Sequence, residues 1–72
     1  MKDNILILDG LSVGQKVKLT RLAKGLRQID VASQANVQPI DITRLEKDRY
    51  VLPTRRKRIL AVLGMDDDHE SD

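Results

Sequence analysis

The 72-residue chain lacks several residue types on which small domains often depend. It has no cysteine and a single histidine, His69, which excludes disulfide scaffolds and zinc fingers. It has no phenylalanine or tryptophan, and Tyr50 is its one aromatic residue. The hydrophobic core must therefore be built from Leu, Ile, Val and Ala.

Long apolar runs and catalytic groupings are also missing. The longest apolar run is Ile5–Leu8, far shorter than the roughly 20 residues that span a bilayer, and no signal peptide precedes it. No nucleophile and base form a recognisable pair, so we expect neither an enzyme nor a cofactor. Asp66–Glu70 contains metal-ligand residue types, but an acidic tail predicts a weak site or none. We therefore expect a cytoplasmic protein with no membrane contact.

The net charge of +2 conceals a strong segregation of charge along the chain. Residues 1–12 carry a net charge of −1, and residues 65–72 carry five acidic residues and no basic one. Residues 13–64 carry twelve Lys and Arg against four acidic residues, a net charge of +8. Such a field attracts polyanions, of which nucleic acid is the commonest in a cytoplasm, although a solvated surface has the same charges. Residues 65–72 are expected to form a disordered acidic tail.

The spacing of caps and apolar residues in 13–64 predicts four short helices and an all-α fold. A capping box of Ser12 and Gln15 opens a helix over 13–24, before Gly25. The next helix covers 28–35 and ends at Asn36. Pro39 opens a helix over 39–47, and the last helix covers 54–63.

Only three residues, 36–38, separate the second helix from the third, which is the turn length of a helix-turn-helix. The apolar positions around this turn share one face, and we expect them to form the core: Val31, Ala32, Ala35, Val37, Ile42 and Leu45. The opposite face of the third helix then carries Gln38, Ile40, Asp41, Thr43 and Arg44. A helix with such a face beside a basic body can enter a DNA major groove.

Three segments also follow a known pattern: Gly25-Leu26-Arg27-Gln28-Ile29-Asp30-Val31-Ala32, then Asn36-Val37, then Ile42-Thr43-Arg44-Leu45-Glu46. Together they resemble the Cro/phage-repressor helix-turn-helix family, also called the xenobiotic-response-element type, over about residues 13–64. The resemblance implies a small lambda-repressor-like four-helix fold. It also implies a transcriptional regulator, a repressor that binds double-stranded DNA at an inverted-repeat operator as a homodimer.

The same resemblance assigns roles to individual residues. Arg21 and Glu46 match a structural ion pair between the first and third helices. Four residues match positions that contact phosphate: Arg27, Gln28, Lys47 and Arg49. Base contacts are expected from Gln38, Pro39, Ile40, Thr43 and Arg44. Arg44 is the strongest of these predictions, because a bidentate guanidinium–guanine contact is the commonest specific one.

The chain departs from the family pattern at three places. Asp41 stands where a small neutral residue is common, and its carboxylate would repel phosphate unless it caps the helix or accepts from cytosine. Asp48 stands where glycine usually follows the third helix. The last helix is also short, and no fifth helix follows Gly64.

The N-terminal segment, residues 1–12, is expected to be extended, with the strand-like run Ile5–Leu8. One hypothesis packs this run on a second apolar stripe of the first helix, formed by Leu19, Leu22, Ala23 and Leu26. Another pairs the run with its copy in a dimer ribbon, and the simplest alternative is a frayed terminus.

Two further functions stay open at the level of sequence. An interaction module, such as an antitoxin, would use the basic body or the acidic tail to bind a protein partner. Non-specific compaction of nucleic acid would use the charge alone, with a steep dependence on salt. For the specific DNA-binding alternative we expect a nucleoid-associated location.

Overall fold

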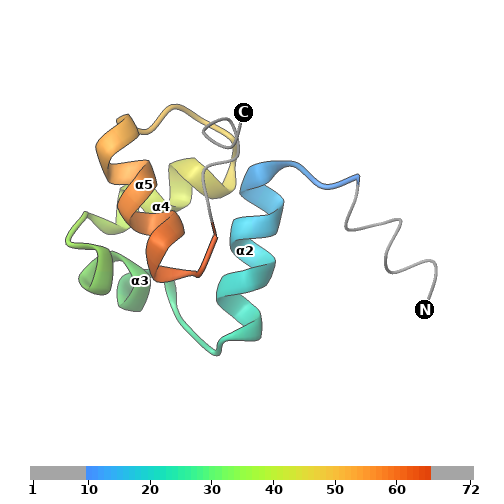
Figure 1. The fold of residues 1–72 in the computed structure, drawn as a ribbon, viewed down its shortest axis with the longest axis horizontal. Helices are drawn as coiled ribbons and strands as arrows, with labels where there is room; N and C mark the ends of the chain where they lie inside the picture. Colours follow the sequence, from blue (N-terminus) through green and yellow to red (C-terminus); the bar gives the residue numbers. More distant parts are fainter. Residues whose placement is uncertain (1–9, 66–72) are drawn as a thin grey trace.

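Four α-helices make up the secondary structure of the computed structural model, which describes residues 10–65 (Figure 1). They are α2 (Val13–Ala23), α3 (Gln28–Ala35), α4 (Pro39–Glu46) and α5 (Pro53–Val62), and no strand occurs within this range. The prediction of four helices is confirmed, and no helix boundary differs from the expected one by more than one residue. The proposed N-terminal strand at Ile5–Leu8 falls outside the described residues.

Helices α2, α3 and α4 begin with a side chain that accepts from a backbone N–H near the helix start, whereas α5 begins with a proline alone. Ser12 and Gln15 form the predicted capping box, with N···O distances of 2.9 and 3.1 Å. Arg27 has no acceptor with which to cap α3, and Asp30 compensates by accepting from the Arg27 backbone N–H at 2.8 Å. Proline at the first position of α4 and α5 has no N–H to satisfy.

All four helices end in the same way, with one residue in the left-handed conformation. These residues are Gly25, Asn36, Asp48 and Gly64, with φ between 57° and 73°, and no other described residue has a positive φ. After each of them a backbone N–H returns to a carbonyl of the last helical turn, as Met65 N does to Leu60 O at 2.8 Å. Glycine and asparagine adopt this conformation most readily, so three of the four ends follow directly from residue type.

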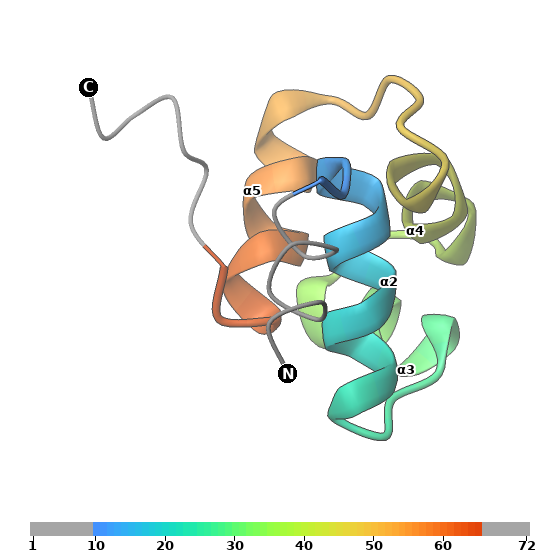
Figure 2. The ribbon, with the colours of Figure 1, turned by 90° about the vertical axis from the view of Figure 1, so that its right-hand side faces the viewer.

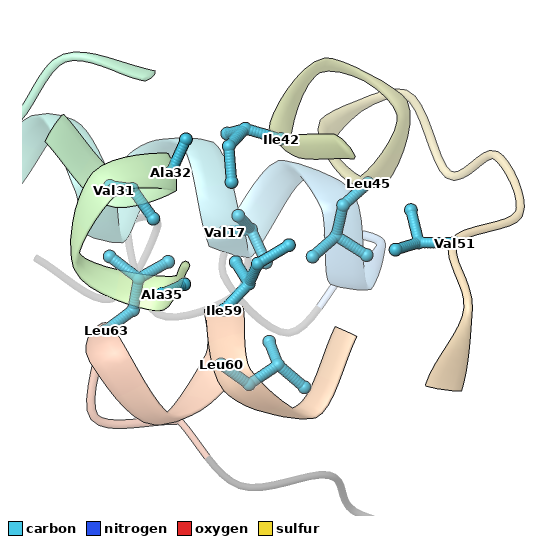
Figure 3. Packing of buried hydrophobic residues seen from close by; sticks show 10 residues of the cluster. All are labelled: Val17, Val31, Ala32, Ala35, Ile42, Leu45, Val51, Ile59, Leu60 and Leu63. Carbon is cyan, nitrogen blue, oxygen red and sulfur yellow. The ribbon is translucent and has the colours of Figure 1, made fainter. Parts of the chain in front are cut away.

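The core is entirely aliphatic (Figure 3), and α4 packs against the other three helices. It comprises Val17, Val31, Ala32, Ala35, Ile42, Leu45, Val51, Ile59, Leu60 and Leu63. Five of the six residues predicted around the turn belong to it, and the sixth, Val37, packs against it half-buried. Ile42 is completely buried, and its truncation to alanine is expected to cost about 2–5 kcal/mol.

Two predictions at the margins of the core were wrong. Leu26 packs against the core and so does not extend the outer stripe of α2. Met65 also packs against the core, so the expected acidic tail does not begin before residue 66, and residues 66–72 fall outside the described part. The hydrogen bond and packing that close α5 hold Met65 in place.

The outer side of α2 faces away from the other helices and is partly apolar (Figure 2). Leu19 is 46% exposed and Leu22 is 52% exposed. The segment that was predicted to cover them lies within residues 1–9, outside the described range. None of the four helices is long and apolar enough to cross a membrane.

Candidate nucleic-acid interface

Helix α4 divides into a buried and an exposed face. Asp41, Ile42 and Leu45 are buried, whereas Ile40 and Arg44 are exposed and Thr43 is half-buried. Successive residues in a helix are rotated by about 100°, so positions 40, 43, 44 and 47 lie on one side. The exposed face therefore offers one apolar side chain, one hydroxyl and two cations in a row.

Most of the residues predicted to contact bases are accessible. Gln38 and Pro39 are exposed at the start of α4, directly after the turn that joins it to α3. Ile40 is 48% exposed although it is apolar. All three residues lie at the N-terminal end of α4, next to the short turn that joins it to α3.

Asp41 does not lie on this face, which corrects the sequence-based placement. Only 3% of Asp41 is exposed. Its carboxylate accepts from the backbone N–H of Gln38 at 3.1 Å and lies 3.7 Å from the guanidinium of Arg55 on α5. The carboxylate caps its own helix from the inner side, because that side offers both an N–H group and a cation.

Three cations around α4 have side chains directed to no partner within residues 10–65. They are Arg44 on the exposed face, Lys47 at the end of the helix and Arg49 beyond it, and all three are exposed. The four carboxylates of the same range are by contrast all engaged: Asp30, Asp41, Glu46 and Asp48 each accept at least one hydrogen bond. Among residues 10–65, the surface beside α4 is therefore positively charged, with no carboxylate paired to these three cations.

Arg27, predicted to contact phosphate, already has an anionic partner. Its guanidinium binds both carboxylate oxygens of Asp30, at 2.9 and 3.0 Å. This contact raises the pKa of Arg27 and, with the hydrogen bond from the Arg27 backbone, lowers the pKa of Asp30 to about 2. A phosphate would have to compete with Asp30 for this guanidinium.

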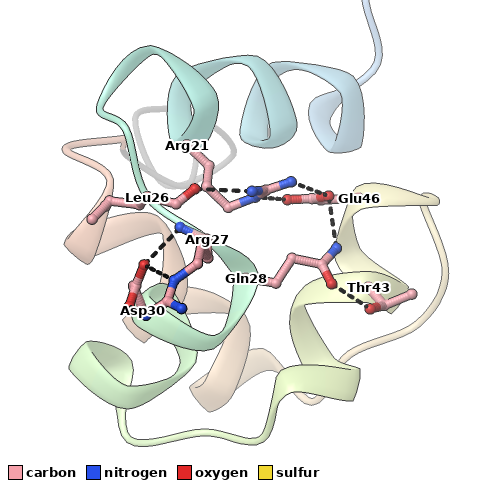
Figure 4. A network of polar contacts seen from close by, with 7 residues as sticks. All are labelled: Arg21, Leu26, Arg27, Gln28, Asp30, Thr43 and Glu46. Atoms are coloured by element: carbon pink, nitrogen blue, oxygen red, sulfur yellow. Dashed lines mark hydrogen bonds and ion pairs between the residues drawn. The ribbon is translucent and has the colours of Figure 1, made fainter.

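Arg21 and Glu46 form the ion pair that the resemblance implies, and it lies in a chain of polar contacts (Figure 4). Arg21 Nε lies 2.6 Å from Glu46 Oε2, and the two side chains are 9% and 5% exposed. A second nitrogen of Arg21 donates to the Leu26 carbonyl at 2.9 Å. Because every charged atom of this buried pair has a partner, the pair ties α2 to α4 without leaving an uncompensated charge.

Gln28 continues this chain toward the exposed face of α4. Its Nε2 donates to Glu46 Oε1 at 3.0 Å, and its Oε1 accepts from the Thr43 hydroxyl at 3.1 Å (Figure 4). Gln28 was predicted to contact phosphate and Thr43 to contact bases. In the structure they bind each other, which leaves Gln28 one amide hydrogen and Thr43 its oxygen lone pairs and methyl group for any ligand.

Sequence reasoning missed the contact between Gly14 and Asp48. The Gly14 N–H donates to Asp48 Oδ1 at 2.9 Å, and Asp48 adopts φ 59°. Hydrogen bonds from the Ser12 hydroxyl and the Gly14 backbone lower the pKa of the Asp48 carboxyl. Asp48 thus takes the left-handed conformation expected of glycine and in addition caps α2, so the departure from the family pattern preserves the turn.

Arg58 is a second structural residue that the sequence did not single out. Its guanidinium donates to the carbonyl oxygens of Ala35 and Asn36, at 3.0 and 3.3 Å. These carbonyls end α3 directly before the turn to α4. Arg58 therefore fixes the turn from α5, and the four-residue basic run at 55–58 is the only signal in the sequence that could have indicated it.

The described part of the chain holds no cluster of three or more residues suited to a metal ion. The acidic stretch Asp66–Glu70 lies outside it. No protein-family model, curated protein or solved structure matches the chain. Its function must therefore be argued from the residues and their geometry.

Proposed function

We propose that this protein is a sequence-specific DNA-binding transcriptional regulator, a repressor with a lambda-repressor-like helix-turn-helix fold. Helix α4 would enter the major groove with its exposed face toward the bases. The observation that carries the proposal is this face: Ile40, Thr43, Arg44 and Lys47 project from a helix held by a three-residue turn. A major groove about 12 Å wide accepts one such helix.

The electrostatics of the body favour a polyanionic ligand. Residues 13–64 have a net charge of +8, and their carboxylates are engaged within the fold. The cations Arg44, Lys47 and Arg49, which have no partner among the described residues 10–65, lie around the exposed side of α4. Lys47 and Arg49 would hold phosphates and set the position of the protein, whereas Arg44 would discriminate guanine through its O6 and N7 atoms.

Homodimerisation is part of the proposal because α4 alone presents little surface for recognition. The helix has 8 residues, which corresponds to a length of about 12 Å and covers only a few base pairs. Two copies on an inverted repeat would place their α4 helices in successive major grooves, about 34–36 Å apart. This spacing is a geometric expectation that a binding site would reveal directly.

Selection of binding sites from a random DNA pool at about physiological salt tests the proposal. An inverted repeat with one-turn spacing is the expected result. Arg44→Ala should then weaken binding to the selected site by about 1–3 kcal/mol and relax the preference at one guanine. Lys18→Ala removes one positive charge on the outer side of α2 and is the matched control, with little expected effect on specificity.

The other two functions predict different results in the same experiment. A pool that stays random while binding falls steeply with salt would indicate non-specific nucleic-acid binding. A pool that is not retained at all would contradict DNA binding and favour a protein partner. A complex with such a partner should persist in Arg44→Ala.

A further inference from the structure

The orientation of the Gln28 amide is determined by the buried ion pair. A carboxylate can only accept hydrogen bonds, so Glu46 Oε1 requires the amide nitrogen of Gln28 at 3.0 Å. Arg21, whose Nε lies 2.6 Å from the other oxygen, supplies the positive charge that pairs with Glu46 in this buried position. The amide oxygen of Gln28 must then point the opposite way, toward α4.

This orientation in turn determines the direction of the hydrogen bond at Thr43. The amide oxygen of Gln28 can only accept, so at 3.1 Å the Thr43 hydroxyl must donate its single proton to it. Thr43 keeps two oxygen lone pairs and its γ-methyl group. A base edge in contact with Thr43 would therefore meet an acceptor and an apolar group, and never a donor.

Ile40 extends the apolar part of this surface. It precedes Thr43 by three positions on the same face of α4, a spacing at which Cβ atoms lie about 5–6 Å apart. Ile40 is 48% exposed. The two side chains thus form a small apolar area in the middle of an otherwise polar face.

We propose that Thr43 and Ile40 contact the C5-methyl group of a thymine, and that Gln28 is a positioning residue that imposes this preference. The inference rests on the proposed function. An A·T pair presents the thymine methyl group and the N6 amino donor of adenine in the major groove, which match an apolar surface and an acceptor. The guanine edge presents acceptors, N7 and O6, which the oxygen of Thr43 would repel.

Replacement of thymine by uracil in the selected binding site tests this, because uracil lacks only the methyl group. One substitution in each half-site should weaken binding of the native protein about fourfold per half-site, the effect of removing one methyl from an apolar contact. Thr43→Ser should reduce the uracil penalty, since it keeps the hydroxyl and loses the methyl group, while Ile40 keeps its own contact with the thymine methyl. Thr43→Val should retain the uracil penalty, whatever its overall affinity.

Glu46→Gln tests whether the ion pair sets the direction of the Thr43 hydrogen bond through Gln28. Only 5% of the Glu46 side chain is exposed, so the substituted residue cannot touch DNA. Arg21 would hold the new amide oxygen, and the new NH2 group would face Gln28 and turn its amide over. The Thr43 hydroxyl would then accept a hydrogen bond from Gln28, which leaves its proton free to donate to a base. The preference for thymine over guanine at this position should fall by about 2- to 12-fold, the value of one hydrogen bond.

Each outcome separates this inference from the proposed function. If no site is selected from the pool, the proposed function fails and the inference fails with it. If a site is selected but no uracil substitution weakens binding, or if the penalty is undiminished in Thr43→Ser, only the inference is overturned. An unchanged thymine preference in Glu46→Gln, with folding verified by circular dichroism, would overturn the role of Gln28 as a positioning residue. The uracil substitutions are measured with the native protein, so they test the methyl contact even if Glu46→Gln does not fold.

Discussion

Gly14 should tolerate substitution poorly, although it is a glycine inside a helix. A Cβ atom at this position would lie 2.4 Å from the Leu45 carbonyl oxygen and 2.7 Å from that of Glu46. Ordinary van der Waals contact begins at 3.4 Å, so α2 would have to move away from the end of α4 by about 1 Å. The obstructing atoms belong to the backbone, and no change of side-chain rotamer relieves them.

The sign of the stability change in Gly14→Ala shows whether the close contact or the helix propensity dominates. Alanine in place of glycine in an open helix would stabilise the protein by about 1 kcal/mol. Overpacking costs about 1–3 kcal/mol, and a backbone obstacle places Gly14→Ala at the upper end of that range. The movement would also stretch the hydrogen bond from Gly14 to Asp48. We therefore expect a net loss of about 2 kcal/mol, which lowers the melting temperature by about 8–16 °C in a domain of this size.

Urea unfolding followed by circular dichroism at 222 nm measures the difference directly. The midpoint should fall while the slope with urea stays constant, because the surface exposed on unfolding does not change. Lys18→Ala, on the exposed side of the same helix, serves as the control and should change the midpoint little. A Gly14→Ala protein as stable as the native one, or more stable, would refute the close contact between α2 and α4.

Three further predictions concern the polar contacts. Arg21→Ala and Glu46→Ala should each destabilise the fold by about 3–5 kcal/mol, whereas the double variant should lose less than their sum, as a thermodynamic cycle would measure. The lowered pKa values of Asp30 and Asp48 mean that both carboxylates stabilise the fold above about pH 4, and that this contribution shrinks as the pH falls; for Asp30, whose pKa is about 2, it is lost as the pH falls through that value. Asp30→Asn should flatten the pH dependence of the urea midpoint, and an unchanged profile would contradict this. Alanine at position 48 should be about 1 kcal/mol less stable than glycine there, because φ is 59°; equal stabilities would argue against the left-handed turn.

Sequence reasoning located the helices well because their ends depend on neighbours in the chain. The capping box of Ser12 and Gln15 spans three residues, and the stops at Gly25 and Asn36 depend on the conformational preference of a single residue. The core around the turn was equally accessible, since an apolar stripe with helical period must face inward. Even the unusual start of α3 is local, with Asp30 three residues after the residue that it caps.

The placement of polar side chains could not be predicted in the same way. Asp41 was assigned to the exposed face of α4, and the inner side instead provides it with the Gln38 N–H and a cation from α5. Gln28 was assigned to phosphate, and it turns toward Glu46 and Thr43. A polar side chain takes the partners that lie within about 3 Å, and those partners depend on how the helices pack.

Local sequence signals are enough to specify a helical domain with an aliphatic core, because helix caps, left-handed stops and apolar periodicity act within a few residues. The direction in which the polar groups face depends instead on how the helices pack. The contact of Asp48 with Gly14 joins residues 34 positions apart, and that of Gln28 with Glu46 joins residues 18 apart. Such contacts form only after the helices have packed, because a hydrogen bond needs its donor and acceptor at a distance and angle that no spacing along the chain prescribes.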